Sequence, residues 1–208
     1  MVDGVASSKG REMSVTDRPP FWLVGLAGRI GHGKDAVCRM LAEEMPQLHV
    51  LMVGFADPLY AGLAAMLGCD EHVLRERTTK DGRIGRCPVP VRQGLQSFGK
   101  WARQQDERWL IELAEWRIGH AVPTPAVVTV TGLRSANEAD WVHSLGGQVW
   151  YVRDVGRPAA HDDEDEVERG LAAHDVDRWL GWDSRHGDIG SQLAPLVREL
   201  IGSGTLAT

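Results

Sequence analysis

Two kinds of hydrophobic pattern alternate along this chain. Continuous apolar runs of strand length predict strands at 21–27, 49–55, 126–131 and 148–153, with a weaker candidate at 176–182. Apolar residues at helical spacing predict helices at 35–44, 58–67, 91–104, 107–119, 137–145 and 189–201. This alternation is typical of the α/β class, so we expect a three-layer α/β/α domain with a mainly parallel, five-stranded sheet.

The same pattern predicts the organisation of the chain. Residues 1–20 are polar and end in Pro19-Pro20, which predicts a flexible leader before a single domain over 21–208. Glycines, prolines and clustered charges interrupt the pattern after Cys69 and again after Arg153. Excursions from an α/β sheet often carry substrate-binding flaps, so we expect a helical insertion over about 57–120 and a lid over about 153–168.

Composition favours a cytoplasmic protein. Hydrophobic residues make up 43% and charged residues 25% of the 208 positions, as in ordinary globular domains. No apolar stretch is long enough to cross a bilayer, and the N-terminus lacks the apolar core of a secretion signal. The three cysteines have no metal-like spacing, which fits reduced thiols. We expect no membrane partner.

The charge distribution narrows the choice of ligand. A net charge of −6 argues against broad nucleic-acid binding, so we expect no nucleic-acid partner. The segment 75–103 nevertheless carries eight cations and two acids, whereas 162–168 is strongly acidic. A cationic segment on an acidic protein suits a small polyanion, although a solvated basic loop explains 75–86 equally well.

The strongest chemical signal follows the first predicted strand. Gly28 to Lys34 has the spacing Gly-x-x-x-x-Gly-Lys of a phosphate-binding loop, and a predicted helix follows it. Glycines let consecutive N–H groups surround an anion, Lys34 would reach the terminal phosphates, and Asp35 replaces the usual Ser or Thr that faces magnesium. We therefore expect a nucleoside triphosphate to contact Gly28, Gly31, His32, Gly33, Lys34, Asp35 and Ala36. For the side chain of His32, simple filling of the loop is the alternative.

One face of the predicted helix at 91–104 is a second candidate site. Arg92, Gln96, Gly99 and Arg103 recur at helical spacing beside an apolar stripe. Guanidinium groups suit phosphate oxygens, the amide of Gln96 suits a base, and Gly99 would leave room for a ligand. An exposed polar helix face is the alternative.

Two more polar residues follow predicted strands. Asp57 precedes Pro58 at a helix start, which favours an N-cap role beside a role in orienting a substrate. Arg134 follows the third strand and should reach the same sheet edge, or else pair with Glu138 one turn away.

The tryptophans divide into two pairs. Trp109 and Trp116 lie at helical spacing, which predicts that they pack in the core. Trp179 and Trp182 are candidates for stacking on a base. The histidines form no convincing metal array.

Taken together, these motifs resemble the phage-type deoxynucleoside monophosphate kinases of the P-loop nucleoside monophosphate kinase superfamily. The similarity covers almost everything after Pro20, through Gly-Lys-Asp at 33–35, Phe-Ala-Asp-Pro-Leu at 55–59, Leu-Gln-Ser-Phe-Gly at 95–99 and Leu-Arg-Ser-Ala-Asn-Glu-Ala at 133–139. It implies a P-loop kinase whose insertion binds the acceptor, with ATP and Mg2+ as cofactors and small nucleotides as partners. The reaction implied is transfer of the ATP γ-phosphoryl group to a deoxynucleoside 5′-monophosphate. A homodimer stays open.

The resemblance also implies a role for each matching residue. Lys34 would hold the ATP phosphates and Asp35 would support magnesium. Arg92, Arg103 and Arg134 would neutralise the acceptor and transferring phosphates, so that these arginines and Lys34 form the expected catalytic set. Asp57 and Gln96 would place the acceptor nucleoside.

Some positions depart from the family pattern. Gly132 stands where an aspartate is frequent, Tyr60 replaces a common lysine, and Trp182 replaces an expected asparagine. Two other functions therefore remain open: a kinase of a non-nucleotide phosphate such as phosphomevalonate, and a P-loop protein that hydrolyses nucleotide slowly as a switch.

Overall fold

The computed structural model describes residues 21–29, 31–76, 82–85, 87, 89–121, 126–156, 171 and 175–202. The predicted leader, and the part of the predicted lid at 157–168, lie outside the described residues.

The described chain builds the expected α/β sheet. Its five strands are β1 (Phe21–Ala27), β2 (His49–Gly54), β3 (Ala126–Leu133), β4 (Gln148–Asp154) and β5 (Arg178–Trp182). All neighbouring pairs are parallel, in the order β2-β3-β1-β4-β5. The predicted fold class and the five strands are confirmed, and β1 lies in the middle of the sheet.

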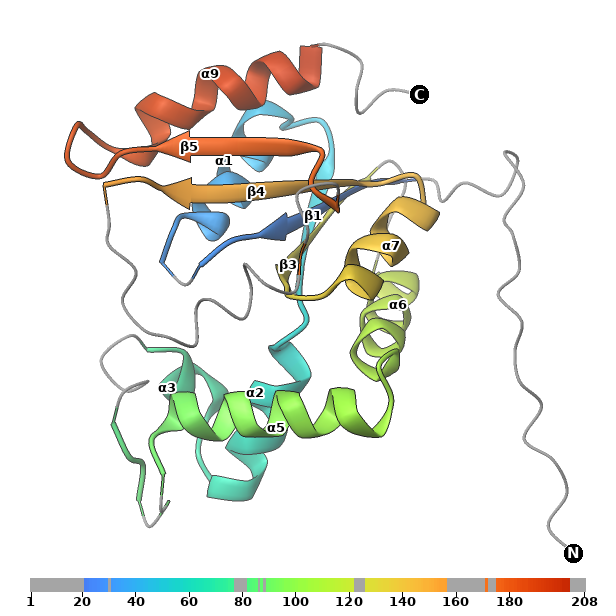
Figure 1. Ribbon diagram of the computed structural model, residues 1–208, viewed down its shortest axis with the longest axis vertical. Coiled ribbons are helices and arrows are strands. Elements are labelled where there is room, and N and C mark those ends of the chain that lie inside the picture. Colours follow the sequence, from blue (N-terminus) through green and yellow to red (C-terminus); the bar gives the residue numbers. More distant parts are fainter. Residues whose placement is uncertain are drawn as a thin grey trace, which may run out of the picture.

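Helices cover both faces of this sheet (Figure 1). One face packs against α1 (Lys34–Glu44) and α9 (Ile189–Gly202), through a core that includes Val37, Trp150 and Leu193. The other face packs against α6 (Trp109–Ala121) and α7 (Ala136–Ser144). The remaining helices α2 (Asp57–Leu67), α3 (Glu71–Arg75) and α5 (Val91–Gln105) gather beside the sheet as a separate group, with their own small core around Leu63 and Leu74 (Figure 1).

Gly132 produces the main irregularity in the sheet. The β1–β3 register shifts between Leu26 and Ala27, so that Gly132 is skipped, and its φ is +88°. A Cβ atom at this position would meet nothing within 4 Å. Glycine is therefore favoured at this position because of the backbone conformation, and not because a side chain would clash.

The prediction that Trp109 and Trp116 pack in the core is wrong. Their exposed fractions are 36% and 65%, and α6 instead buries Leu110, Ile111, Ala114 and Ile118. The described chain contains no helix long and apolar enough to pass through a bilayer.

Cys38 ties α1 to β3 and, through Thr129, to the edge strand β2. Its buried thiol donates a hydrogen bond to Thr129 Oγ1 at 3.2 Å, and the Thr129 hydroxyl donates to the carbonyl of Leu51 at 3.4 Å. Burial, which outweighs the hydrogen bond from the thiol to Thr129, raises the pKa of Cys38 to about 11. The thiol is therefore a poor nucleophile in the folded protein.

We predict that Cys38 makes the fold less stable at alkaline pH. Between pH 9 and about 11 the folded protein keeps the thiol proton that the unfolded chain releases, so the free energy of unfolding falls as pH rises. The slope from this one group reaches about 1.4 kcal/mol per pH unit. Urea unfolding across this range should show a steeper decline for wild type than for Cys38→Ala. Equal slopes in the two proteins would contradict the assignment.

Candidate active site

The turn from β1 into α1 forms a loop suited to an anion. Gly28, Gly31 and Gly33 have φ values of +125°, +79° and +102°, which other residues rarely adopt. Gly33 is also the N-cap of α1, so the loop leads directly into the N-terminal, positive end of the helix dipole. A helix N-terminus beside curled backbone amides is a binding site for phosphate.

Two of these glycines allow close packing as well as unusual dihedral angles. A Cβ atom on Gly28 would lie 2.2 Å from the carbonyl oxygen of Val152 in β4. One on Gly33 would lie 2.0 Å from Ile189 Cδ1 in α9. The loop is therefore held between the end of β4 and the start of α9.

Lys34 folds back across the loop. Its ammonium group donates hydrogen bonds to the carbonyls of Gly28 at 2.7 Å and Arg29 at 2.8 Å. The positive charge thus lies against the first two residues of the loop, within reach of an anion bound there.

His32 fixes the loop to the neighbouring strands. The residue is only 2% exposed, and its Nδ1 accepts a hydrogen bond from the backbone N–H of Asp154 at 3.2 Å. Its carbonyl accepts one from Trp182 Nε1 at 2.8 Å. The ring contacts the protein, which agrees with loop filling, and the Trp182 indole holds the loop.

Asp154 belongs to this arrangement, although the sequence did not single it out. One carboxylate oxygen accepts hydrogen bonds from the N–H groups of Gly156 at 2.9 Å and Ser184 at 3.0 Å. Burial raises the pKa of Asp154, but the hydrogen bonds from Ser184 and Gly156 and the nearby His32 outweigh it and hold the pKa below its ordinary value. An aspartate at the end of a parallel strand was the available signal.

Asp57 anchors two arginines at the end of β2. The prediction of an N-cap is wrong, because Ala56 is the N-cap of α2 and no side chain caps the helix. The Asp57 carboxylate instead accepts hydrogen bonds from the backbone N–H of Gly54 at 2.8 Å, from Arg75 Nη2 at 2.7 Å and from Arg117 Nη1 at 2.6 Å. Arg75 and Arg117 come from α3 and α6, so this one carboxylate joins three parts of the chain.

Glu138 organises the end of β3 in a similar way. Its side chain is 2% exposed and accepts hydrogen bonds from Arg103 Nε at 3.0 Å and Arg103 Nη2 at 2.8 Å. Its other oxygen accepts the backbone N–H of Arg134 at 2.6 Å. Glu138 therefore contacts Arg134 through the backbone, and the guanidinium charge of Arg103 is partly neutralised.

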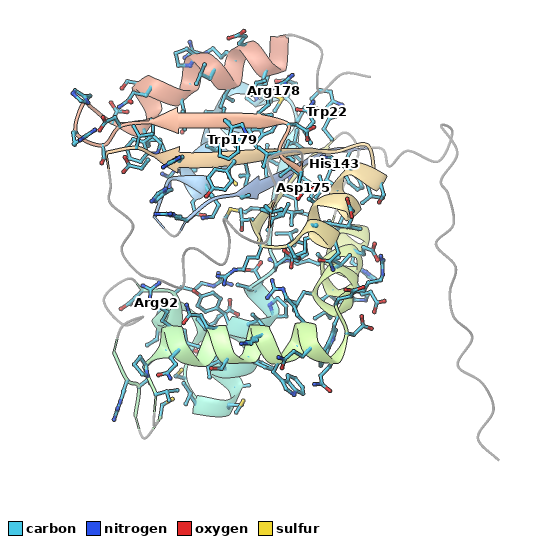
Figure 2. The ribbon with its side chains drawn as sticks, viewed as in Figure 1. Trp22, Arg92, His143, Asp175, Arg178 and Trp179 are labelled. Carbon is cyan, nitrogen blue, oxygen red and sulfur yellow. The ribbon has the colours of Figure 1, made fainter. Side chains whose placement is uncertain are left out.

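On the polar face of α5, Gly99 does not leave room for a ligand as the sequence predicted. Arg92 and Gln96 are half-buried, and Figure 2 shows Arg92 at the end of α5 that lies near α3. Gly99 is buried, with its Cβ position 3.1 Å from Leu59 Cδ1 and 3.4 Å from Arg103 Nη1. The glycine therefore admits protein atoms rather than a ligand.

Trp179 and Trp182, the candidates for stacking on a base, do not face each other across a gap that could hold one. The Trp182 indole donates a hydrogen bond to the carbonyl of His32 in the loop, whereas the Trp179 ring packs on Tyr151, with ring centroids 4.6 Å apart.

The strand order places the predicted site residues along the carboxyl ends of the strands. Because all strands are parallel, their carboxyl ends share this edge, and the order β2-β3-β1 lines up Asp57, Arg134 and the glycine loop. Neighbouring strands are about 4.8 Å apart, so Asp57 and the loop follow strands about 10 Å apart. This spacing suits a polyphosphate in the loop and a second anion beside it.

Asp35 is the residue that the sequence predicts to support magnesium, and this role stays a prediction. It is exposed in the first turn of α1, directly after Lys34. The described residues contain no cluster of three metal-ligating side chains. Magnesium is commonly held by one or two carboxylates together with substrate phosphates and water, so this donor set fits magnesium bound with a nucleotide.

Comparisons with known proteins find similar structures but no related family. No protein-family model and no curated protein matches the chain. Solved structures do match, among them shikimate kinase from Aquifex aeolicus, with 12% identity, a TM-score of 0.47, and coverage of 88% of this chain and 98% of that chain. This distant likeness leaves the ligands of the present protein to be inferred from its own residues.

We predict that the hydrogen bond accepted by His32 supports nucleotide binding. His32→Ala leaves the buried Asp154 N–H without its acceptor, so the dissociation constant for ATP should rise about tenfold. His32→Gln, which retains an acceptor, should recover part of the loss. Titration calorimetry on folded variants measures both effects. His143→Gln is the control, because His143 bonds Asp177 on another part of the protein. A folded His32→Ala variant with wild-type affinity would contradict the role.

Proposed function

We propose that the protein transfers the γ-phosphoryl group of ATP to a deoxynucleoside 5′-monophosphate. The observation that carries this proposal is the loop between β1 and α1, in which three glycines have positive φ and the ammonium group of Lys34 bonds the carbonyls of Gly28 and Arg29. The arginines of α5 and of the β3 end support a second, phosphorylated substrate. The identity of that substrate rests on the family resemblance of the motifs at 33–35, 55–59, 95–99 and 133–139.

The chain would act mainly by positioning and charge. The loop N–H groups and Lys34 would hold the β- and γ-phosphates in place of the carbonyls that Lys34 now contacts. Magnesium, held by Asp35 and phosphate oxygens, neutralises charge on the phosphates when it is bound. An oxygen of the acceptor phosphate then forms the new bond to the γ-phosphorus, while the bond from that phosphorus to the β–γ bridging oxygen breaks and ADP leaves. No general base is required, since the attacking oxygen is already anionic.

The contacts of Arg103 and Asp57 support an indirect role for these two residues. Arg103 already shares its charge with Glu138, and Asp57 binds Arg75 and Arg117. We assign contact with the acceptor phosphate to Arg92 and Arg134 because the family resemblance of their motifs implies it. Arg103 would keep the helix and the strand end in place, and Asp57 would act on the acceptor indirectly, through the group of helices it holds together.

The direct test is an ADP-release assay with ATP, magnesium and a panel of deoxynucleoside and ribonucleoside monophosphates. We expect stimulation by at least one deoxynucleotide. In Lys34→Ala this rate should fall at least about a thousandfold, because removing the ammonium group removes charge stabilisation of the transferring phosphoryl group. Near-normal turnover in a folded Lys34→Ala protein would contradict the site. If only phosphomevalonate stimulated ADP release, the protein would be a kinase of that non-nucleotide phosphate. If ADP were released slowly and at the same rate with every acceptor, a nucleotide-hydrolysing switch would be favoured.

A second prediction separates the acceptor from the donor. Arg92→Ala should raise KM for the acceptor or lower kcat by a factor of about 10 to 100 while leaving the dissociation constant for ATP nearly unchanged. Arg108→Ala provides the control, since Arg108 is 54% exposed and pairs with Glu115. Equal weakening of ATP and acceptor in Arg92→Ala would argue against its placement.

A further inference from the structure

The carboxylate of Asp57 joins two arginines that come from different helices. Arg117 Nη1 donates to one of its oxygens at 2.6 Å and Arg75 Nη2 donates to the other at 2.7 Å. Figure 1 shows α6, which carries Arg117, and α3, which carries Arg75, on either side of the start of α2. The Asp57 side chain is 17% exposed and also accepts the N–H of Gly54, so its position is fixed from the strand end as well. We call these three side chains, of Arg117, Asp57 and Arg75, the Asp57 bridge.

One end of the Asp57 bridge rests on the sheet. Helix α6 packs on the core of the sheet through Leu110, Ile111, Ala114 and Ile118, and Arg117 directly precedes the last of these. Within the described chain the side chain of Arg117 bonds to Asp57 alone. The contribution of this guanidinium to the fold therefore passes through the Asp57 carboxylate.

The other end of the Asp57 bridge holds α3. This helix has only five residues, too few to be stable without tertiary contacts. Arg75 lies over the Tyr60 ring, with its Cζ 4.4 Å from the ring centroid, and its Nε donates to Glu71 at 2.7 Å. Protein groups thus hold the guanidinium on one face and at two of its three nitrogens. This arrangement favours anchoring of α3 over contact with a ligand.

A small core connects α3 with Arg92. Leu74 of α3 and Val91 of α5 are both 0% exposed and belong to one cluster with Leu63 and Ala64 of α2. This cluster is separate from the core between the sheet and its helices. Val91 directly precedes Arg92, which Figure 2 shows at this end of α5. Because close-packed side chains transmit displacements, the position of α3 determines the position of Arg92.

We propose that Arg117 and Arg75 are positioning residues, which act through Asp57 to fix α3, and with it Arg92, relative to the edge of the sheet. The consequence for the acceptor rests on the proposed function, in which Arg92 contacts the acceptor phosphate. Loss of the Asp57 bridge would displace Arg92 from that phosphate and weaken acceptor binding. The glycine loop would keep its shape, because its close contacts are with β4 and α9.

Hydrogen exchange of the full chain, without any ligand, tests the structural part of the proposal. Arg117→Met removes the charge and keeps most of the length of the side chain. We expect the hydrogen-bonded amides at 73–76 and 94–98 to exchange about tenfold faster, while those of α1 exchange at the wild-type rate. Arg117→Lys, which can still pair with Asp57, should recover part of the protection.

Two further variants show whether Arg117 acts through Asp57. Asp57→Asn should speed exchange at the same amides, and adding Arg117→Met to it should change little more, because the two residues act as one unit. Arg108→Met is the matched control. Arg108 is also an exposed arginine of the segment that enters α6, but it pairs with Glu115. It should leave exchange at both sets of amides unchanged.

Steady-state kinetics tests the consequence for the acceptor. With the deoxynucleoside monophosphate that best stimulates ADP release, Arg117→Met should raise KM for the acceptor about tenfold and leave the dissociation constant for ATP unchanged. Arg117→Lys should again recover part of the loss, and Arg108→Met should have the wild-type KM.

Unchanged exchange at 73–76 in Arg117→Met overturns the proposal, whatever the activity of the protein. Faster exchange with an unchanged acceptor KM, or with ATP and acceptor weakened equally, also overturns it, because Arg92 would then not depend on the Asp57 bridge. If exchange changes as expected but wild type uses no nucleotide acceptor, the proposed function fails while the structural role of Arg117 and Arg75 is supported.

Discussion

The close approach of backbone at the end of β1 is the constraint on which the candidate site depends. Gly28 has the Val152 carbonyl where its side chain would be, and Gly33 has Ile189 in the corresponding place. Neither contact is possible unless β1 lies beside β4 and α9 covers that edge of the sheet. The core packing of a whole domain thus determines the shape of a loop of seven residues, and the loop in turn determines where the charge of Lys34 lies.

Carboxylates at the strand ends extend this order along the sheet edge. Asp57, Glu138 and Asp154 each accept a backbone N–H near a strand end, at Gly54, Arg134 and Gly156 respectively. Two of them also bind arginines from other helices. Hydrogen bonds offset the free-energy cost of removing such carboxylates from water. The same hydrogen bonds hold the neighbouring arginine side chains in fixed positions. Two cations of the basic segment 75–103, Arg75 and Arg103, are therefore held in place by carboxylates of the protein itself.

The sequence predicted the strands well because parallel buried strands are continuous apolar runs. It placed β1 at its observed bounds, and the glycine spacing identified the loop. It could not assign the face of α6, since the stripe with Trp109 and Trp116 and the stripe with Ile111 and Ile118 both have helical spacing. Only packing decides which of them meets the sheet. The sequence also could not predict the partners of His32 and Asp57. Asp154 lies 122 residues from His32 along the chain, and Arg117 lies 60 residues from Asp57.

The central claim is that Lys34 exchanges its carbonyl partners for nucleotide phosphates. A crystal structure with a non-hydrolysable ATP analogue, magnesium and a deoxynucleoside monophosphate tests it most directly. We predict the β- and γ-phosphates inside the loop, with the Lys34 ammonium group moved from the carbonyls of Gly28 and Arg29 onto phosphate oxygens and the acceptor phosphate between the loop and Arg92. A nucleotide bound elsewhere, with Lys34 still on both carbonyls, would contradict the account.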